Sequence, residues 1–208
     1  MRTKMMLFFC LTAITVSADN YEVSSPNGKV KVTVNTDAAV KWSVDYDGRQ
    51  VLLPSTIDIR LVQGKKTVGL GTVGKVAKCS VNRSFKNPFY KRLTVSDEYG
   101  QLLLYTTQKF TIEVRAYNDG AAYRLISKEK KAAQVADETV EFCFADDYPA
   151  FIPYVNDNRA GERYCYSFES YYDEVALSKM YPDSLAITPL AVCLPGGMKA
   201  IVMDAGIS

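Results

Sequence analysis

The 208-residue chain contains no histidine. This absence excludes a histidine general base, a Ser-His-Asp triad and a His-ligated zinc site built from this chain alone. Any catalytic role would fall to carboxylates, tyrosine, lysine or arginine. After residue 20 there is also no unbroken apolar run long enough to cross a bilayer. We therefore expect no membrane span in the domain that follows the N-terminal segment.

That N-terminal segment has the three-part layout of a secretory signal peptide. Met1–Lys4 is basic, Met5–Val16 is apolar, and small residues end at Ala18. We expect residues 1–18 to be cleaved and residues 19–208 to form one exported domain, periplasmic or extracellular. A buried N-terminal helix is the alternative, and the basic start at the first residues disfavours it.

The charge of the chain is balanced once this segment is removed. Loss of Arg2 and Lys4 lowers the 25 basic residues to 23, which equals the 23 acidic residues. No clustered Lys/Arg stripe remains of the kind that binds nucleic acid, so no nucleic-acid partner is expected.

Cysteine is sparse and its spacing indicates neither a metal site nor a disulfide framework. Cys79, Cys143, Cys165 and Cys193 remain after cleavage, and no two of them form a CxxC pair. Because Cys79, Cys143 and Cys193 lie in apolar, strand-like sequence, we expect free, buried thiols that behave as small hydrophobes. The alternative is disulfide pairing of the four in an exported protein, for which three connectivities exist.

Apolar and polar residues alternate with period two along most of the chain, which is typical of strands with one buried face. A turn is expected at residues 97–100, a hairpin turn at 118–120, a further hairpin around 195–197, and a short helix or turn within 173–180. Together, the alternating segments and the turns between them predict an all-β antiparallel sandwich or barrel. The alternating segments are residues 30–34, 40–46, 57–61, 102–107, 110–117, 121–125, 139–144, 191–194 and 199–203.

Residues 145–175 form the least regular stretch, where aromatic residues alternate with carboxylates. Long loops on a β scaffold often carry function, although a solvated loop packed on the sandwich is the simpler interpretation. Asp146, Asp147 and residues 156–158 offer oxygen ligands, but they do not follow the EF-hand register. Arg115 and Arg124 flank the turn at 118–120, and we interpret them as exposed arginines beside a plain hairpin, with pairing to acids on neighbouring strands as the alternative.

Several of these segments together resemble one family. They are residues 25–32 (SPNGKVKV), 44–52 (VDYDGRQVL) and 115–124 (RAYNDGAAYR), in that order, followed by 168–172 (FESYY). They resemble the N-terminal domain of glycoside hydrolase family 97, the exported α-glucosidases and α-galactosidases typical of gut Bacteroidetes. The segment 202–205 also resembles a family strand, except that Asp204 stands where the family usually has Glu.

The resemblance implies a galactose-mutarotase-like β super-sandwich that packs against a following (β/α)₈ barrel. It also implies that residues 19–208 are an N-terminal domain incomplete at its C-terminus, with the last part of the usual domain and the barrel both absent. In the family the catalytic carboxylates and most calcium ligands lie on the barrel, and one Glu of the N-terminal domain reaches the calcium ion. The matching residue here is Glu169, with Glu174 as its nearest competitor. The expected partners are therefore the chain's own barrel and an oligosaccharide substrate, and the expected cofactor is calcium.

Two other functions remain open on the sequence alone. One is a stand-alone exported carbohydrate-binding β-sandwich, and the other is an exported structural domain without a ligand. A following reading frame of alternating strands and helices would favour the glycosidase module, because a (β/α)₈ barrel needs roughly 250 residues of such sequence.

Overall fold

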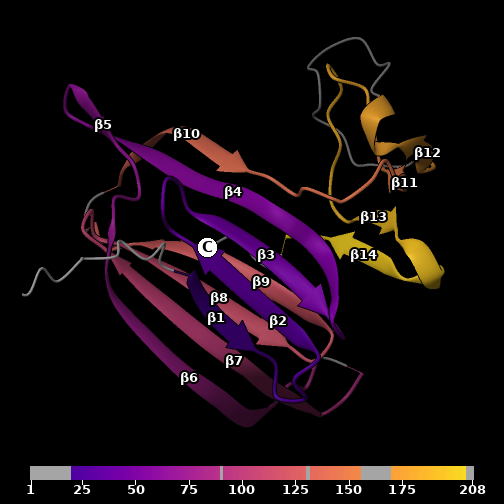
Figure 1. Cartoon of the computed structure of the whole chain (residues 1–208), viewed down its shortest axis with the longest axis horizontal. Helices are drawn as coiled ribbons and strands as arrows, with labels where there is room; N and C mark the ends of the chain where they lie inside the picture. Colours follow the sequence, from indigo (N-terminus) through magenta and orange to yellow (C-terminus); the bar gives the residue numbers. More distant parts are fainter. Residues whose placement is uncertain (1–19, 90, 130–131, 156–169, 205–208) are drawn as a thin grey trace, which may run out of the picture.

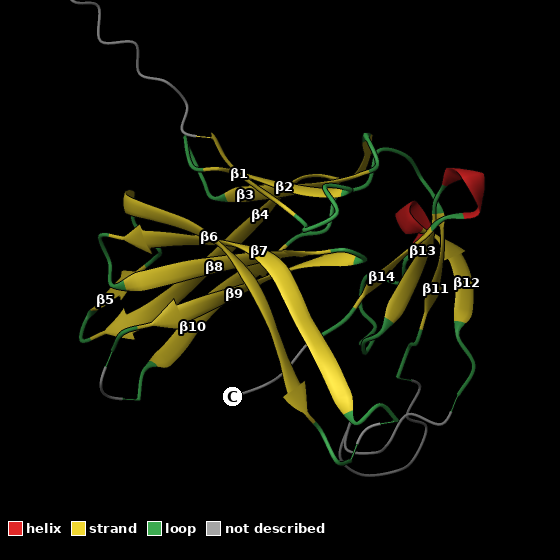
Figure 2. Ribbon diagram, turned by 90° about the horizontal axis from the view of Figure 1, so that it is seen from below, coloured by secondary structure: helices red, strands yellow, loops and turns green. Residues whose placement is uncertain are grey.

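The structure is a computed structural model that describes residues 20–89, 91–129, 132–155 and 170–204. Two large antiparallel sheets stack face to face, and a smaller third sheet lies beside them (Figure 1 and Figure 2). The all-β antiparallel sandwich expected from the sequence is confirmed. In the described part of the chain, no helix is long and apolar enough to cross a membrane.

The first sheet has the order β1–β2–β3–β4–β10, and β5 pairs with β4 outside that path. Its strands are β1 (Asn20–Ser24), β2 (Val30–Asn35), β3 (Lys41–Tyr46), β4 (Arg49–Gln63), β5 (Lys66–Val68) and β10 (Gln134–Val140). Asp47 and Gly48 both have positive φ and join β3 to β4, as the Asp-Gly turn signal predicts.

The second sheet is a meander in the order β6–β7–β8–β9. Its strands are β6 (Val73–Lys86), β7 (Thr94–Thr106), β8 (Phe110–Tyr117) and β9 (Gly120–Ser127). The hairpin predicted around residues 118–120 is confirmed, because Tyr117 pairs with Gly120 across the turn.

The third sheet has the order β12–β11–β13–β14. It comprises β11 (Pro149–Ile152), β12 (Asp173–Ala176), β13 (Leu190–Cys193) and β14 (Lys199–Val202), with short 3₁₀ turns η1 (Leu177–Lys179) and η2 (Pro195–Gly197). The predicted final hairpin is thus confirmed. The predicted helix or turn at 173–180 is a strand in its first half and a 3₁₀ turn in its second.

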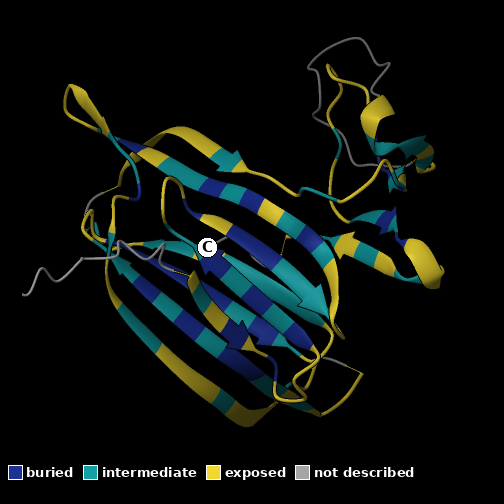
Figure 3. Cartoon of the chain, viewed as in Figure 1, coloured by how far each residue is buried: buried dark blue, intermediate teal, exposed yellow. Residues whose placement is uncertain are grey.

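The main core lies between the two large sheets. The valines of β2 alternate inward, and they face the inward side chains of β8, all of them buried (Figure 3). The residues concerned are Val30, Val32 and Val34 on β2 and Ile112, Val114 and Ala116 on β8. Period-two alternation therefore predicted this core correctly.

Three sequence expectations are corrected by the structure. The turn expected at residues 97–100 is wrong, because β7 continues through them and pairs with β6 along its whole length. The strand expected at 139–144 stops at Val140, and beyond it only Cys143 forms a bridge, to Leu53.

The third correction concerns the cysteines. Cys79, Cys143 and Cys193 are free, as expected, but Cys79 is exposed and the other two are half-buried. Cys79 lies on the outer face of β6, where its thiol donates to Gln101 at 3.1 Å. Cys165 lies outside the described residues.

Candidate functional site

The segment 115–124 that carries the sequence resemblance folds into the β8–β9 hairpin. Its outer face presents Glu113 and Arg115 from β8 and Arg124 from β9. Glu113 is the direct cross-strand partner of Arg124, so the antiparallel register places their side chains together. Arg115 follows on the same face because strand side chains alternate with period two.

Glu113 is held by three donors. Arg115 donates its Nε to Oε1 at 2.7 Å, and Gln101 on β7 donates its amide to the same oxygen at 2.5 Å. Arg124 donates its Nε to Oε2 at 2.5 Å. Both carboxylate oxygens are thus engaged, and Glu113 is 2% exposed although it lies on the outer face of the sheet.

Arg115 is also held in place by contacts of its own. Its guanidinium lies 4.5 Å from the centre of the Tyr99 ring and donates to the Tyr117 hydroxyl at 3.2 Å. The interpretation of both arginines as exposed residues beside a plain hairpin is therefore wrong. Both pair with a neighbouring acid, and only Arg124 keeps a largely exposed side chain.

Burial acts to raise the pKa of Glu113, but the hydrogen bonds from Arg115, Gln101 and Arg124 outweigh it and lower that pKa below its ordinary value. The pKa of Arg115 is raised: burial opposes the shift, and the hydrogen bonds and charges of Tyr117 and Glu113 cause it. Glu113 is therefore a fixed anion at neutral pH. A carboxylate with both oxygens occupied is poorly placed to act as a general acid or base.

The sequence analysis assigned calcium binding to Glu169, with Glu174 as its nearest competitor. Glu169, the assigned ligand, lies outside the described residues, as do residues 156–158. Glu174 is described: it lies exposed on β12, opposite Phe151 of β11. The described residues contain no group of three or more Asp, Glu, Cys or His side chains arranged to hold a metal ion.

Asp146 and Asp147 have local roles. The Asp147 carboxylate accepts from the Ser178 backbone N–H and hydroxyl, both at 2.7 Å. These bonds lower the pKa of Asp147. Asp146 accepts from the Asp147 backbone N–H at 2.8 Å. Both acids thus stabilise the turn before β11 and its contact with η1.

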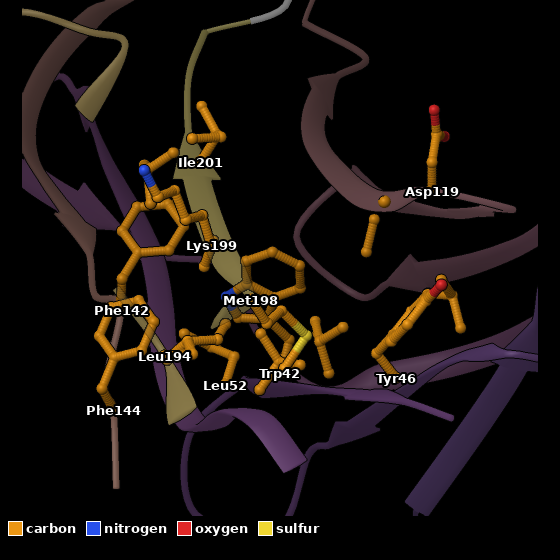
Figure 4. A pocket seen from close by; sticks show the side chains of 17 residues that line it. Trp42, Tyr46, Leu52, Asp119, Phe142, Phe144, Leu194, Met198, Lys199 and Ile201 are labelled. Carbon is orange, nitrogen blue, oxygen red and sulfur yellow. The ribbon is translucent and has the colours of Figure 1, made fainter. Parts of the chain in front are cut away.

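A cleft of about 370 Å³ opens where β14 meets the sandwich (Figure 4). Trp42 of β3, Leu52 of β4, Phe142 and Met198 line it, with Lys199 among its polar lining residues. Trp42 is buried, and its indole Nε1 has no hydrogen-bond partner among the described residues. The sequence analysis missed this cleft because its walls come from segments far apart in the chain.

Tyr123 of β9 packs edge-on against Trp42, with ring centres 4.9 Å apart. Burial, together with the negative charges of Glu138 and Asp204, raises the pKa of Tyr123 to about 12. Tyr123 therefore stays neutral at physiological pH.

Comparison with known proteins gives a consistent result. Residues 23–208 match the model of the family described as Glycosyl-hydrolase 97 N-terminal. A curated retaining alpha-galactosidase of Bacteroides thetaiotaomicron is 29% identical over 206 residues, which are 97% of this chain and 31% of that protein. The chain thus spans about a third of the length of this relative.

Solved structures share the fold at low identity. A glycoside hydrolase family 97 enzyme from Pseudoalteromonas sp. strain K8, in complex with acarbose, superposes with a TM-score of 0.64 at 19% identity. That match covers 83% of this chain and 26% of the other. A beta-arabinopyranosidase superposes with a TM-score of 0.76 at 18% identity, covering 90% of this chain and 32% of the other.

Proposed function

The chain belongs to the family of glycosyl-hydrolase 97 N-terminal domains, and on that basis we propose that it is the non-catalytic N-terminal module of a larger α-glycosidase. The observation that carries the proposal is the family match over residues 23–208 combined with the length of the relative, of which the chain spans 31%. The remaining length is ample for a (β/α)₈ barrel.

The division of labour follows from the chemistry of the reaction. Glycoside hydrolysis uses two carboxyl groups that flank the scissile bond, one of which must exchange protons. Glu113, the buried carboxylate of the sandwich, is occupied by Arg115, Arg124 and Gln101. In this proposal the catalytic pair lies on the following barrel, and the sandwich shapes its surroundings.

The substrate is proposed to be an α-glucoside or an α-galactoside. The name of the Bacteroides relative, a retaining alpha-galactosidase, supports the second. Because the proposal places the reacting carboxylates on the barrel, the choice between the two sugars rests on barrel residues.

Calcium is part of the proposal through Glu169. Calcium takes six to eight oxygen ligands, and carboxylates are among its preferred donors. One carboxylate from this chain would fill only a small part of such a shell. Glu169 would hold the ion together with barrel residues, and the ion would then tie the two domains together.

Export completes the proposal. The basic start and apolar run of residues 1–18 support a cleaved signal peptide. The substrate would then be met outside the cytoplasm.

The test uses the full-length protein and the 19–208 chain side by side. Nitrophenyl α-galactoside and α-glucoside are assayed with calcium present. We expect turnover by the full-length protein and none by the chain alone. Turnover by the chain that disappears on changing one of its own carboxylates would overturn the proposal. A gene that lacks a following barrel would favour a stand-alone carbohydrate-binding sandwich instead.

A further inference from the structure

Strands β6 and β7 extend well beyond the end of β8, the next strand of their sheet. They pair with each other from Val73↔Thr106 to Lys86↔Thr94, whereas β8 pairs with β7 only at Gly100–Tyr105. Residues 82–98 therefore form a two-stranded arm, which projects below the sandwich in Figure 2. Its five register pairs give it a length of roughly 17 Å.

The arm ends in apolar side chains that contact little of the described structure. Phe85 is 49% exposed, Phe89 is 97% exposed and Leu93 is 62% exposed. At the start of the loop between the strands, the Asn87 backbone N–H donates to the Leu93 carbonyl at 2.9 Å. Three large apolar side chains are thus exposed at the end of the arm and in its loop, and exposed apolar surface of this kind marks interaction sites.

The tip also carries an unbalanced positive charge. Lys86, Lys91 and Arg92 lie among the apolar residues, and the sequence from Phe85 to Ser96 contains no Asp or Glu. The acids of the arm lie nearer its base, where Asp97 pairs with Arg83 at 2.7 Å and Glu98 accepts from Ser96. The described residues place no carboxylate within ion-pair distance of the three tip cations.

An isolated two-stranded ribbon is marginally stable in water, so an arm of this kind gains most from a surface that covers it. The chain spans only 31% of its curated relative, and the rest of that relative's length is a candidate cover. We propose that the arm tip docks on the domain that follows this chain, with Phe85, Phe89 and Leu93 in an apolar depression that is rimmed by carboxylates. This rests on the proposed function and adds the contact that joins the two domains.

Trypsin tests the proposal directly, because Lys86, Lys91 and Arg92 are cleavage sites at an exposed loop tip. The experiment uses the full-length protein and follows cleavage after Lys91 and Arg92. When the arm redocks faster than trypsin cleaves it, the cleavage rate is proportional to the population of the undocked arm. The Phe89→Ser, Leu93→Ser double variant should therefore be cut about tenfold faster at these sites than the wild type. Raising the salt concentration should also speed cleavage of the wild type, because salt screens the tip cations.

Val135→Ser is the matched control. Val135 is a similarly exposed apolar residue, 52% exposed on β10 of the other large sheet, and its substitution should leave tip cleavage unchanged. Equal cleavage of the wild type and the double variant would overturn the proposal. Protection that appears only when an anionic polysaccharide or nucleic acid is added would also overturn it, because the tip would then bind an external polymer.

Activity assays separate this proposal from the proposed function. A full-length protein with a protected tip but no α-glycosidase activity would contradict the proposed function and keep the docked arm. An active protein with an unprotected tip would support the proposed function and contradict the docked arm.

Discussion

A Cβ atom on Gly100 would overlap the backbone carbonyl oxygen of Ser24. Gly100 lies in the middle of β7, and Ser24 ends β1 of the opposite sheet. The lack of a side chain at Gly100 therefore lets the first strand approach the second sheet closely, at a point where both residues help to close the sandwich.

Gly100→Ala should destabilise the chain by about 2–4 kcal/mol, because the methyl group meets backbone that can move only by displacing β1. Urea unfolding measures this, and Trp42 serves as the probe because it is the single tryptophan and is buried. Gly74→Ala on β6 is the matched control. Its Cβ would meet only the Tyr105 carbonyl oxygen at 3.9 Å, an ordinary contact. Equal losses in the two variants would show that close approach is not the reason for glycine at position 100.

Glu113→Gln should cost about 2–3 kcal/mol, because Arg115 and Arg124 would lose their charged acceptor at a buried position. Urea unfolding at pH 7 measures the loss. Arg124→Gln is the comparison, and it should cost less because the Arg124 side chain is 62% exposed. A Glu113→Gln variant as stable as the wild type would contradict a structural role for this ion-pair cluster.

The pH dependence of stability follows from the same carboxyl group. The pKa of Glu113 is lowered on folding, so its contribution is fully present above its ordinary value of 4.5 and is lost as pH falls through the lower folded value. Unfolding free energies measured from pH 6 down to pH 3 should fall more steeply for the wild type than for Glu113→Gln. Parallel curves would show that Glu113 titrates normally in the folded chain.

The sequence predicted the sandwich core well, because alternation reports directly on which side of a strand is buried. It could not place Gly100 within a strand, because the sequence of residues 97–100 is typical of a turn. The need for glycine there becomes visible only when the strand that packs against it is known. The neighbour that requires glycine there, Ser24, is 76 residues away in the chain.

The side chains of the outer sheet face were harder still to predict. Arg115 and Arg124 look solvated in the sequence because they flank a turn and point away from the core. Their shared acid, Glu113, precedes the turn on the same outer face, and only the strand pairing brings it to Arg124. Cys79 looks buried beside apolar neighbours, but it lies on the outer face of a strand whose far end forms the projecting arm. The register between neighbouring strands determines the partners of these arginines and the exposure of this cysteine, and composition carries no information on register.

Cysteine reactivity tests the corrected placement. In the folded 19–208 chain, Cys79 should react with a thiol reagent in the fastest phase because it is exposed, while Cys143 and Cys193 should react more slowly. Cys79→Ser should remove one equivalent from the fast phase, and Cys193→Ser should leave that phase intact. If Cys79→Ser leaves the fast phase unchanged, Cys79 is covered in solution.

Glu169 carries the last prediction, which concerns calcium in the full-length protein. Calcium affinity depends on the number of charged ligands, so Glu169→Gln should weaken calcium binding by about tenfold or more while the fold is kept. Calorimetric titration measures the affinity without reference to activity. Activity should fall in the variant, and excess calcium should restore part of it, because mass action refills a weakened site.

Glu174→Gln is the control for this titration, since Glu174 is the competitor that the sequence offers and the structure describes it as exposed on β12. It should keep the wild-type affinity. If Glu174→Gln weakens binding and Glu169→Gln does not, the ligand is Glu174 and the assignment of Glu169 from the sequence resemblance is wrong. If neither changes the affinity, neither residue is a calcium ligand, and the assignment of calcium to this pair of acids is wrong.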